Sequence, residues 1–253
     1  GVPLPRPLSP HVETDMAFGG FQPANANRHV VHWRSDPQFH TQVNYRRETP
    51  CLLIVEPTYG PAQDLEPGGT FESFRTFELV YDSTERERRG LALRRMYRTI
   101  APWVTENPLM MHVRWSDPKT VHRAIDQCAR VGFEMVILTF GSGFNIEIDS
   151  PDYLASIRSY ADAARAKGIE IGGYSLLASR RVGGGNDVVS PPGDRPTFGN
   201  CPALTSTWGR DYFRKLYQFY DQTGFRLLEH DGSYPGDLDI TPRPPLQKGL
   251  RNS

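Results

Sequence analysis

The sequence predicts an α/β protein in which a β-sandwich-like N-terminal segment precedes the first half of a (β/α)8 TIM barrel. The main observation is an order that recurs three times: helix, glycine, two residues, buried strand and polar loop, with the glycines at Gly132, Gly168 and Gly224. Strands that alternate with helices at this spacing form right-handed βαβ units and a parallel sheet. The second observation is the count of strands. Four are reached by Asp231, whereas a complete barrel needs roughly 250 residues by itself.

The chain divides into three predicted parts. Residues 1–82 are β-rich, with a buried run CLLIV at 51–55 and alternating apolar residues in TFESFRTFELVY at 70–81. Residues 83–105 predict a linker helix, because apolar residues recur there at helical spacing among many charges. Residues 106–253 are the expected partial barrel, with strands 1–4.

Capping residues and apolar runs place the elements of the partial barrel. Helices are expected to begin at Asp117-Pro118 and at Ser150-Pro151, because a capping side chain followed by proline is a helix start signal. A third helix is expected before Gly224. The expected strands are Leu109–Trp115, Glu134–Phe140, Ile169–Ser175 and Phe225–Glu229.

Charge and composition exclude several classes of partner. The chain of 253 residues has 29 Lys and Arg against 29 Asp and Glu, so its formal net charge is zero and no basic face for nucleic acid is indicated. No apolar run approaches the roughly 18 residues of a membrane span. The three cysteines, Cys51, Cys128 and Cys201, have no CxxC spacing and predict neither a disulfide framework nor a zinc motif. The glycine-rich GGGN at 183–186 lacks the residues of a phosphate loop, so we expect no cofactor.

The end of the last expected strand carries the candidate chemistry. Side chains alternate along a strand, so Glu229 and Asp231 share one face and His230 lies on the other. Two carboxylates at the mouth of a parallel barrel fit a glycosidase site, in which one carboxylate attacks the anomeric carbon. Asp231 is therefore the candidate catalytic residue. In the alternative interpretation Asp231-Gly232 is only a turn, and Glu229 is an interior charge paired with a basic residue.

The order of these segments resembles the retaining α-galactosidase-like (melibiase-like) superfamily of glycoside hydrolases over about residues 65–235. In that family a β-sandwich and a linker helix precede a (β/α)8 barrel. PGGTFESFRTFELVY and the arginine-rich helix look like the passage from sandwich to barrel. The positions of the first four barrel strands are occupied by PLMMHVRWSD, GFEMVILTFGSGF, IEIGGYSLL and FRLLEHDGSY.

The resemblance implies roles for particular residues. Asp231 matches the nucleophile, Trp115 matches an aromatic residue of the first strand, and Glu229 falls where the family often has a sugar-binding lysine. The family's acidic pair after the second strand is replaced by Thr139-Phe140-Gly141. Both departures concern galactose specificity and leave the reaction type open. The remaining substrate-binding candidates, near strand ends or in the segments that follow, are His230, Arg180, Tyr174 and Tyr234.

The sequence thus predicts a glycosidase, an O-glycosyl hydrolase that acts on an α-linked, galactoside-like carbohydrate by a retaining mechanism. Two alternatives stay open. One is a carbohydrate-binding relative without catalysis, and the other is a metal-dependent barrel hydrolase or isomerase that uses His112, His230 and Asp231.

The incomplete strand count leads to further expectations. We expect the chain to be a fragment whose acid/base residue lies beyond Ser253, with little hydrolase activity of its own. The alternative is a complete open α/β sheet, whose last strand would need to be covered. An open sheet edge favours association, so a homo-oligomer is expected. The family resemblance favours an extracellular or periplasmic location.

Overall fold

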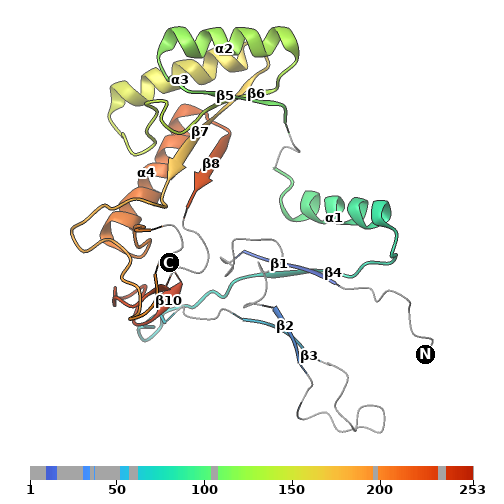
Figure 1. The fold of residues 1–253 in the computed structure, drawn as a ribbon, viewed down its shortest axis with the longest axis vertical. Helices are drawn as coiled ribbons and strands as arrows, with labels where there is room; N and C mark the ends of the chain where they lie inside the picture. Colours follow the sequence, from blue (N-terminus) through green and yellow to red (C-terminus); the bar gives the residue numbers. More distant parts are fainter. Residues whose placement is uncertain are drawn as a thin grey trace. The chain divides into compact units, whose positions relative to one another are not determined.

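The computed structural model describes residues 10–15, 31–34, 37, 52–56, 62–103, 108–195, 199–232 and 238–252. The chain separates into two compact units. The first consists of Gly1–Tyr59 with Leu65–Glu106, and the second of Gly60–Asp64 with Asn107–Ser253. Figure 1 shows the helices and strands of both units.

In the first unit, the described residues form two antiparallel strand pairs and one helix. β1 (His11–Thr14) pairs with β4 (Thr76–Leu79), and β2 (Val31–Arg34) pairs with β3 (Leu52–Val55). α1 (Arg86–Ile100) follows β4 and buries none of its residues. These pairs are two separate sheets, so no sandwich is shown within the part of the chain that the structure describes.

The second unit is an α/β structure built on a four-stranded parallel sheet. The sheet order is β5-β6-β7-β8, and each neighbouring pair is parallel. This confirms the prediction of four adjacent parallel strands, while the described residues show no closed barrel. Strands and helices alternate as β5 (Met110–Val113), α2 (Pro118–Val131), β6 (Met135–Leu138), α3 (Pro151–Arg165), β7 (Glu170–Leu176), α4 (Thr207–Thr223) and β8 (Leu227–Asp231).

Short capping signals determine where these helices begin and end. The Asp117 carboxylate accepts a hydrogen bond from the Thr120 N–H at 3.0 Å, directly before the first residue of α2. Gly132 and Gly224 end α2 and α4 with φ angles of 83° and 74°. Glycine adopts this left-handed conformation at no steric cost, so the chain leaves each helix and enters the next strand after a short turn.

The helices cover one face of the sheet, and the apolar core lies between the sheet and the helices. Val136, Leu138 and Ile171 pack there with the buried residues of α2, α3 and α4. Figure 1 shows the three helices along the same side of the sheet. Because side chains alternate along each strand, the Ile137 side chain points to the opposite face. That opposite face carries the candidate carboxylates.

The face of the sheet opposite the helices is curved. Neighbouring strands lie about 4.8 Å apart, so the backbones of β5 and β8 would be roughly 14 Å apart in a flat sheet of this order. Yet His112 on β5 and Glu229 on β8 approach to 4.0 Å between Nε2 and Oε2. The two edge strands therefore bend toward each other on this face. His112 of β5, Tyr174 of β7 and Glu229 of β8 all lie on this face.

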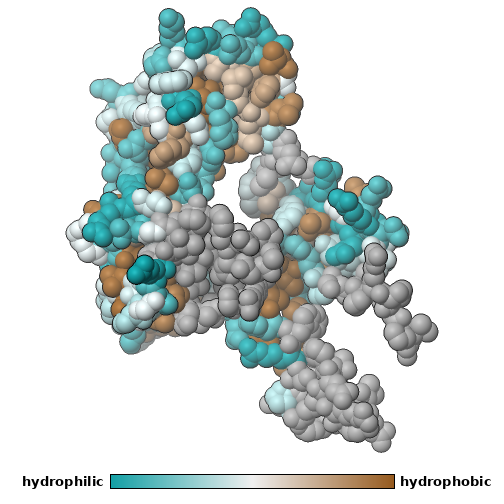
Figure 2. Space-filling view, in the orientation of Figure 1, coloured by the Kyte–Doolittle hydropathy of each residue, from teal (hydrophilic) through white to brown (hydrophobic). Residues whose placement is uncertain are grey.

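Apolar side chains are exposed at the β5 edge of the sheet. Leu109, Met110 and Val131 are exposed at the start of β5 and at the end of α2. Figure 2 shows hydrophobic surface over this region of the second unit. At the other edge of the sheet, the chain after β8 leads to β9 (Leu238–Asp239). β9 pairs with β10 (Arg251–Asn252) in a separate two-stranded sheet.

A buried ion pair fastens the segment after β8 to the long loop between β7 and α4. Asp239 Oδ2 lies 3.2 Å from Arg243 Nε, and the two side chains are only 1% and 11% exposed, respectively. The Asp239 carboxylate also accepts the Val189 N–H at 3.1 Å, and the Arg243 guanidinium donates to the Gly185 and Asp187 carbonyls at 2.8 and 2.9 Å. The pair thus joins two segments that flank the carboxyl ends of β7 and β8.

Asp239→Asn should therefore lower the free energy of unfolding by about 3–5 kcal/mol, because it leaves Arg243 buried without its counter-charge. Urea unfolding followed by circular dichroism measures the change. The control is Asp162→Asn, which removes an exposed ion pair with Arg165 at 2.9 Å and should cost less than about 1 kcal/mol. Equal losses for the two variants would contradict the structural role assigned to Asp239.

Candidate functional site

The strand register brings the predicted site residues of β7 and β8 onto one face of the sheet. Tyr174 is the register partner of Glu229, and Leu176 is the partner of Asp231. Partners in a parallel pair point to the same side, and this side is opposite the helices. Tyr174, Glu229 and Asp231 therefore meet at the carboxyl end of the sheet, where parallel α/β folds place their chemistry.

Asp231 is held through both its side chain and its backbone. Its Oδ2 accepts a hydrogen bond from the Tyr174 hydroxyl. Its backbone carbonyl accepts two more, from the Leu177 N–H at 2.7 Å and the Ala178 N–H at 3.2 Å. These contacts fix the direction of the carboxylate from the neighbouring strand.

Gly232 permits this close approach of the two segments. Its φ is 115°, and a Cβ atom at this position would lie 2.1 Å from the Ala178 nitrogen. The close packing against Ala178 therefore requires glycine at this position, which an ordinary Asp-Gly turn would not explain. Asp231 itself belongs to β8, and its carboxylate bonds across to β7.

Glu229 lies one pleat deeper and faces His112. The 4.0 Å between Glu229 Oε2 and His112 Nε2 is too long for a hydrogen bond. Within the described residues, Glu229 Oε2 is buried and has no hydrogen-bond partner. A buried acceptor without a donor costs about 1–3 kcal/mol. A polar ligand that donates a hydrogen bond to Glu229 after a small movement of its side chain would remove this cost.

A groove lies at the carboxyl ends of β6 and β7. Its volume is about 450 Å³, and Tyr174 and Arg180 are among the residues that line it. The other walls come from the loop that follows β6, including Phe140, Phe144 and Glu147. The groove therefore lies beside Asp231, with Tyr174 shared between the two.

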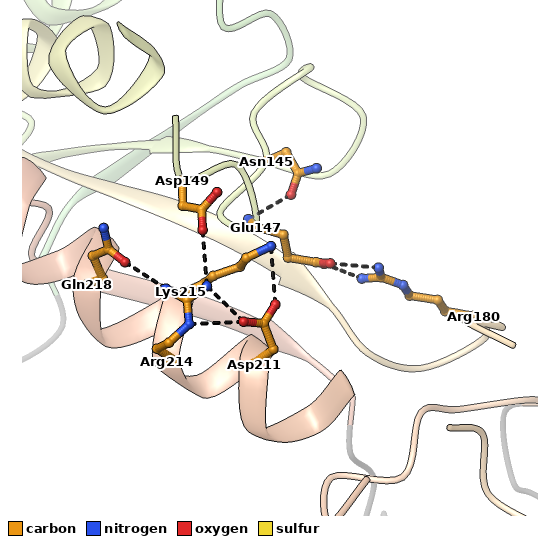
Figure 3. Close-up of polar contacts among 8 residues, drawn as sticks. All are labelled: Asn145, Glu147, Asp149, Arg180, Asp211, Arg214, Lys215 and Gln218. Carbon is orange, nitrogen blue, oxygen red and sulfur yellow. Dashed lines mark hydrogen bonds and ion pairs between the residues drawn. The ribbon is translucent and has the colours of Figure 1, made fainter. Parts of the chain in front are cut away.

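Arg180 is fixed at the polar end of this groove. Its Nη2 donates to Glu147 Oε2 at 3.0 Å, in a two-pronged ion pair that Figure 3 shows. Its guanidinium lies over the Trp208 ring, 5.0 Å from the ring centroid. The sequence predicted Arg180 as a site residue but missed Glu147. The acidic motif NIEID after the second strand was the available signal.

The other predicted residues lie apart from this group. Trp115 is 64% exposed in the loop after β5 and does not line the groove. His230 lies on the helix-facing side, where its Nε2 is 3.3 Å from the Tyr212 hydroxyl. Desolvation lowers the pKa of His230, and the charge of Asp231 partly offsets the shift. Tyr234 lies outside the described residues.

The alternative metal-binding set does not converge. His112 and Asp231 share a face of the sheet, whereas His230 points to the opposite face. Among the residues that the structure describes, no group of three or more His, Cys, Asp or Glu is placed to hold a metal ion. Cys128 and Cys201 are buried and separate, and burial raises the pKa of the Cys128 thiol.

Comparisons with known proteins give no family assignment. No protein-family model matches the chain, and no curated protein matches it. In the part of the chain that the structure describes, no helix has the length and apolar character needed to cross a membrane.

Gly232→Ala should disrupt the junction beside Asp231, because the added methyl group would collide with the backbone of Leu177 and Ala178. The matched control is Gly168→Ala, at φ 71° with no atom within 4 Å of the added carbon. The control should lose only about 1–2 kcal/mol of unfolding free energy from backbone strain, and Gly232→Ala should lose clearly more. Urea unfolding compares them, and a smaller loss for Gly232→Ala would contradict the packing described.

Proposed function

We propose that the second unit carries half of a retaining glycosidase site in which Asp231 is the nucleophile. The observation that carries the proposal is the position of Asp231 at the carboxyl end of β8, with its carboxylate oriented by Tyr174. A second carboxylate, Glu229, lies beneath it on the same face. Beside them lies a groove lined partly by aromatic residues, which suit the apolar faces of sugar rings.

The proposed scaffold is the first half of a (β/α)8 barrel. Its support is the sequential strand order, the helices on one face, and the approach of β5 and β8 on the other. The exposed apolar residues at the β5 edge fit a strand that pairs with another strand in a complete barrel. The acid/base group opposite Asp231 would then belong to the other half.

The proposed reaction proceeds in two steps. The ionised Asp231 attacks the anomeric carbon of an α-linked sugar and forms a covalent glycosyl-enzyme, while the bond to the leaving group breaks. Water then displaces the carboxylate and restores it. The Tyr174 hydroxyl donates to Oδ2 and so orients the carboxylate for this attack. Glu229 accepts a hydrogen bond from a sugar hydroxyl, which satisfies its buried oxygen.

Asp231→Asn should abolish covalent labelling by 5-fluoro-α-glycosyl fluorides of the galacto and gluco series. Fluoride leaves without protonation, so labelling does not need an acid catalyst, and the ring fluorine slows hydrolysis of the trapped intermediate. Intact mass spectrometry of the unmodified protein should show one added fluoroglycosyl group, and peptide mapping should place this group on Asp231. Labelling on another residue, or continued labelling of Asp231→Asn, would overturn the nucleophile assignment. Sugar binding without any labelling would favour a binding protein that lacks catalysis.

Glu229→Gln should weaken sugar binding by about tenfold or more, because a hydrogen bond to a charged acceptor is worth about 1.5–3 kcal/mol. Titration calorimetry with the sugars that bind the unmodified protein gives the affinities. Glu170→Gln is the matched control, since Glu170 belongs to the same face at the opposite end of β7 and its side chain is 41% exposed. An equal loss in both variants would show that the effect is not local to the site.

A further inference from the structure

We propose that the groove beside Tyr174 binds a second sugar residue of the substrate, linked to the sugar that Asp231 attacks. This inference rests on the proposed function and narrows the substrate class to di- and oligosaccharides. It comes from the groove's two walls, which differ in chemistry, and from their position relative to Asp231.

The polar wall is the Glu147–Arg180 ion pair. Both side chains are largely buried, at 20% and 28% exposed, yet both line the groove. Arg180 Nη1 also donates to the Leu176 carbonyl at 3.2 Å, and its guanidinium packs over Trp208. The pair offers fixed acceptor oxygens beside fixed N–H donors, with no net charge. Such a pair suits neighbouring hydroxyl groups of a neutral ligand.

The loop that carries Glu147 is anchored at a second point. Asp149 accepts a hydrogen bond from Arg214 of α4 at 3.1 Å, and Arg214 in turn bonds Asp211. Asn145 Oδ1 accepts the Glu147 N–H at 2.9 Å within the loop. Figure 3 shows both attachments of this loop. Glu147 is therefore pre-positioned, which lowers the entropic cost of binding a ligand.

The apolar wall is aromatic. Phe140 is 61% exposed, although it is one of the largest apolar side chains near the sheet. Its ring lies edge-on to Tyr174, with the centroids 5.5 Å apart. The exposed Phe140 ring, held beside the half-buried Tyr174 in the lining of the groove, is available to pack against a ligand. A pyranose ring matches the two walls, because it has an apolar C–H face and a hydroxyl-bearing edge.

Tyr174 separates this groove from the nucleophile. Its hydroxyl reaches the Asp231 carboxylate, whereas its ring packs against Phe140 in the groove. Asp231 does not line the groove. A sugar attacked at Asp231 and a ring held by Glu147 and Arg180 therefore occupy different positions. The volume of about 450 Å³ lies within the usual range of ligand sites, about 300–1,000 Å³.

The test compares methyl α-D-glycosides of galactose, glucose and mannose with α-linked disaccharides whose non-reducing sugar is the same. Titration calorimetry should show at least one disaccharide that binds about tenfold tighter than its methyl glycoside. Glu147→Gln and Arg180→Lys should reduce that advantage several-fold, because each alters the donors and acceptors of the pair. Binding should also change the fluorescence of Trp208, which a Trp208→Phe comparison identifies.

Asp126→Asn is the control. It removes an exposed ion pair between Asp126 of α2 and Lys167, outside the groove and outside the loop that carries Glu147, and should keep the full disaccharide advantage. A panel without any disaccharide advantage overturns the inference, and so does an equal loss in Asp126→Asn. The labelling experiment separates the two proposals. Labelling of Asp231 without a disaccharide advantage would reject the second subsite and leave the proposed nucleophile standing. A disaccharide advantage that depends on Glu147, without any labelling, would support the groove as a sugar-binding site and reject the proposed reaction.

Discussion

The candidate site depends on the contact between the end of β8 and the chain that leaves β7. The Asp231 carbonyl accepts N–H groups from Leu177 and Ala178, and Gly232 allows the two backbones to meet. This contact does more than extend the sheet by one residue. It sets the position of the Asp231 carboxylate and also the start of the loop that carries Arg180. The Asp231 carboxylate and the groove therefore share one backbone junction.

Several features around this junction cost stability. Glu229 has a buried oxygen without a hydrogen-bond donor among the described residues, and Phe140 exposes most of its ring. Local costs of this kind are tolerated where a ligand relieves them and where the surrounding structure is firmly held. Here the support comes from the core between sheet and helices and from the buried Asp239–Arg243 pair. The costs and the candidate chemistry lie at the same end of the sheet.

Much of the second unit could be predicted from the sequence, because its signals are local. Asp117 and Gly132 mark the ends of α2, and alternation along β8 placed Glu229 and Asp231 on one face. The groove's ion pair could not be predicted in this way. Glu147 and Arg180 lie in loops after different strands, and their contact depends on how those loops fold over the sheet. The approach of His112 to Glu229 was not predicted for a related reason, since only the curvature of the sheet brings the two side chains together.

The same curvature links the fold to the proposed chemistry. A flat parallel sheet would leave the side chains of β5 and β8 too far apart to act on one small ligand. Bending of the face opposite the helices brings His112 Nε2 to 4.0 Å from Glu229 Oε2, while the helices remain packed on the other face. In the proposed reaction, residues of β5 and β8 would then contact the same sugar ring, and Tyr174 of β7, which donates a hydrogen bond to Asp231, would orient the attacking carboxylate. Sequential strand order and the core beneath the helices thus give a site assembled from several strands, each contributing one or two side chains.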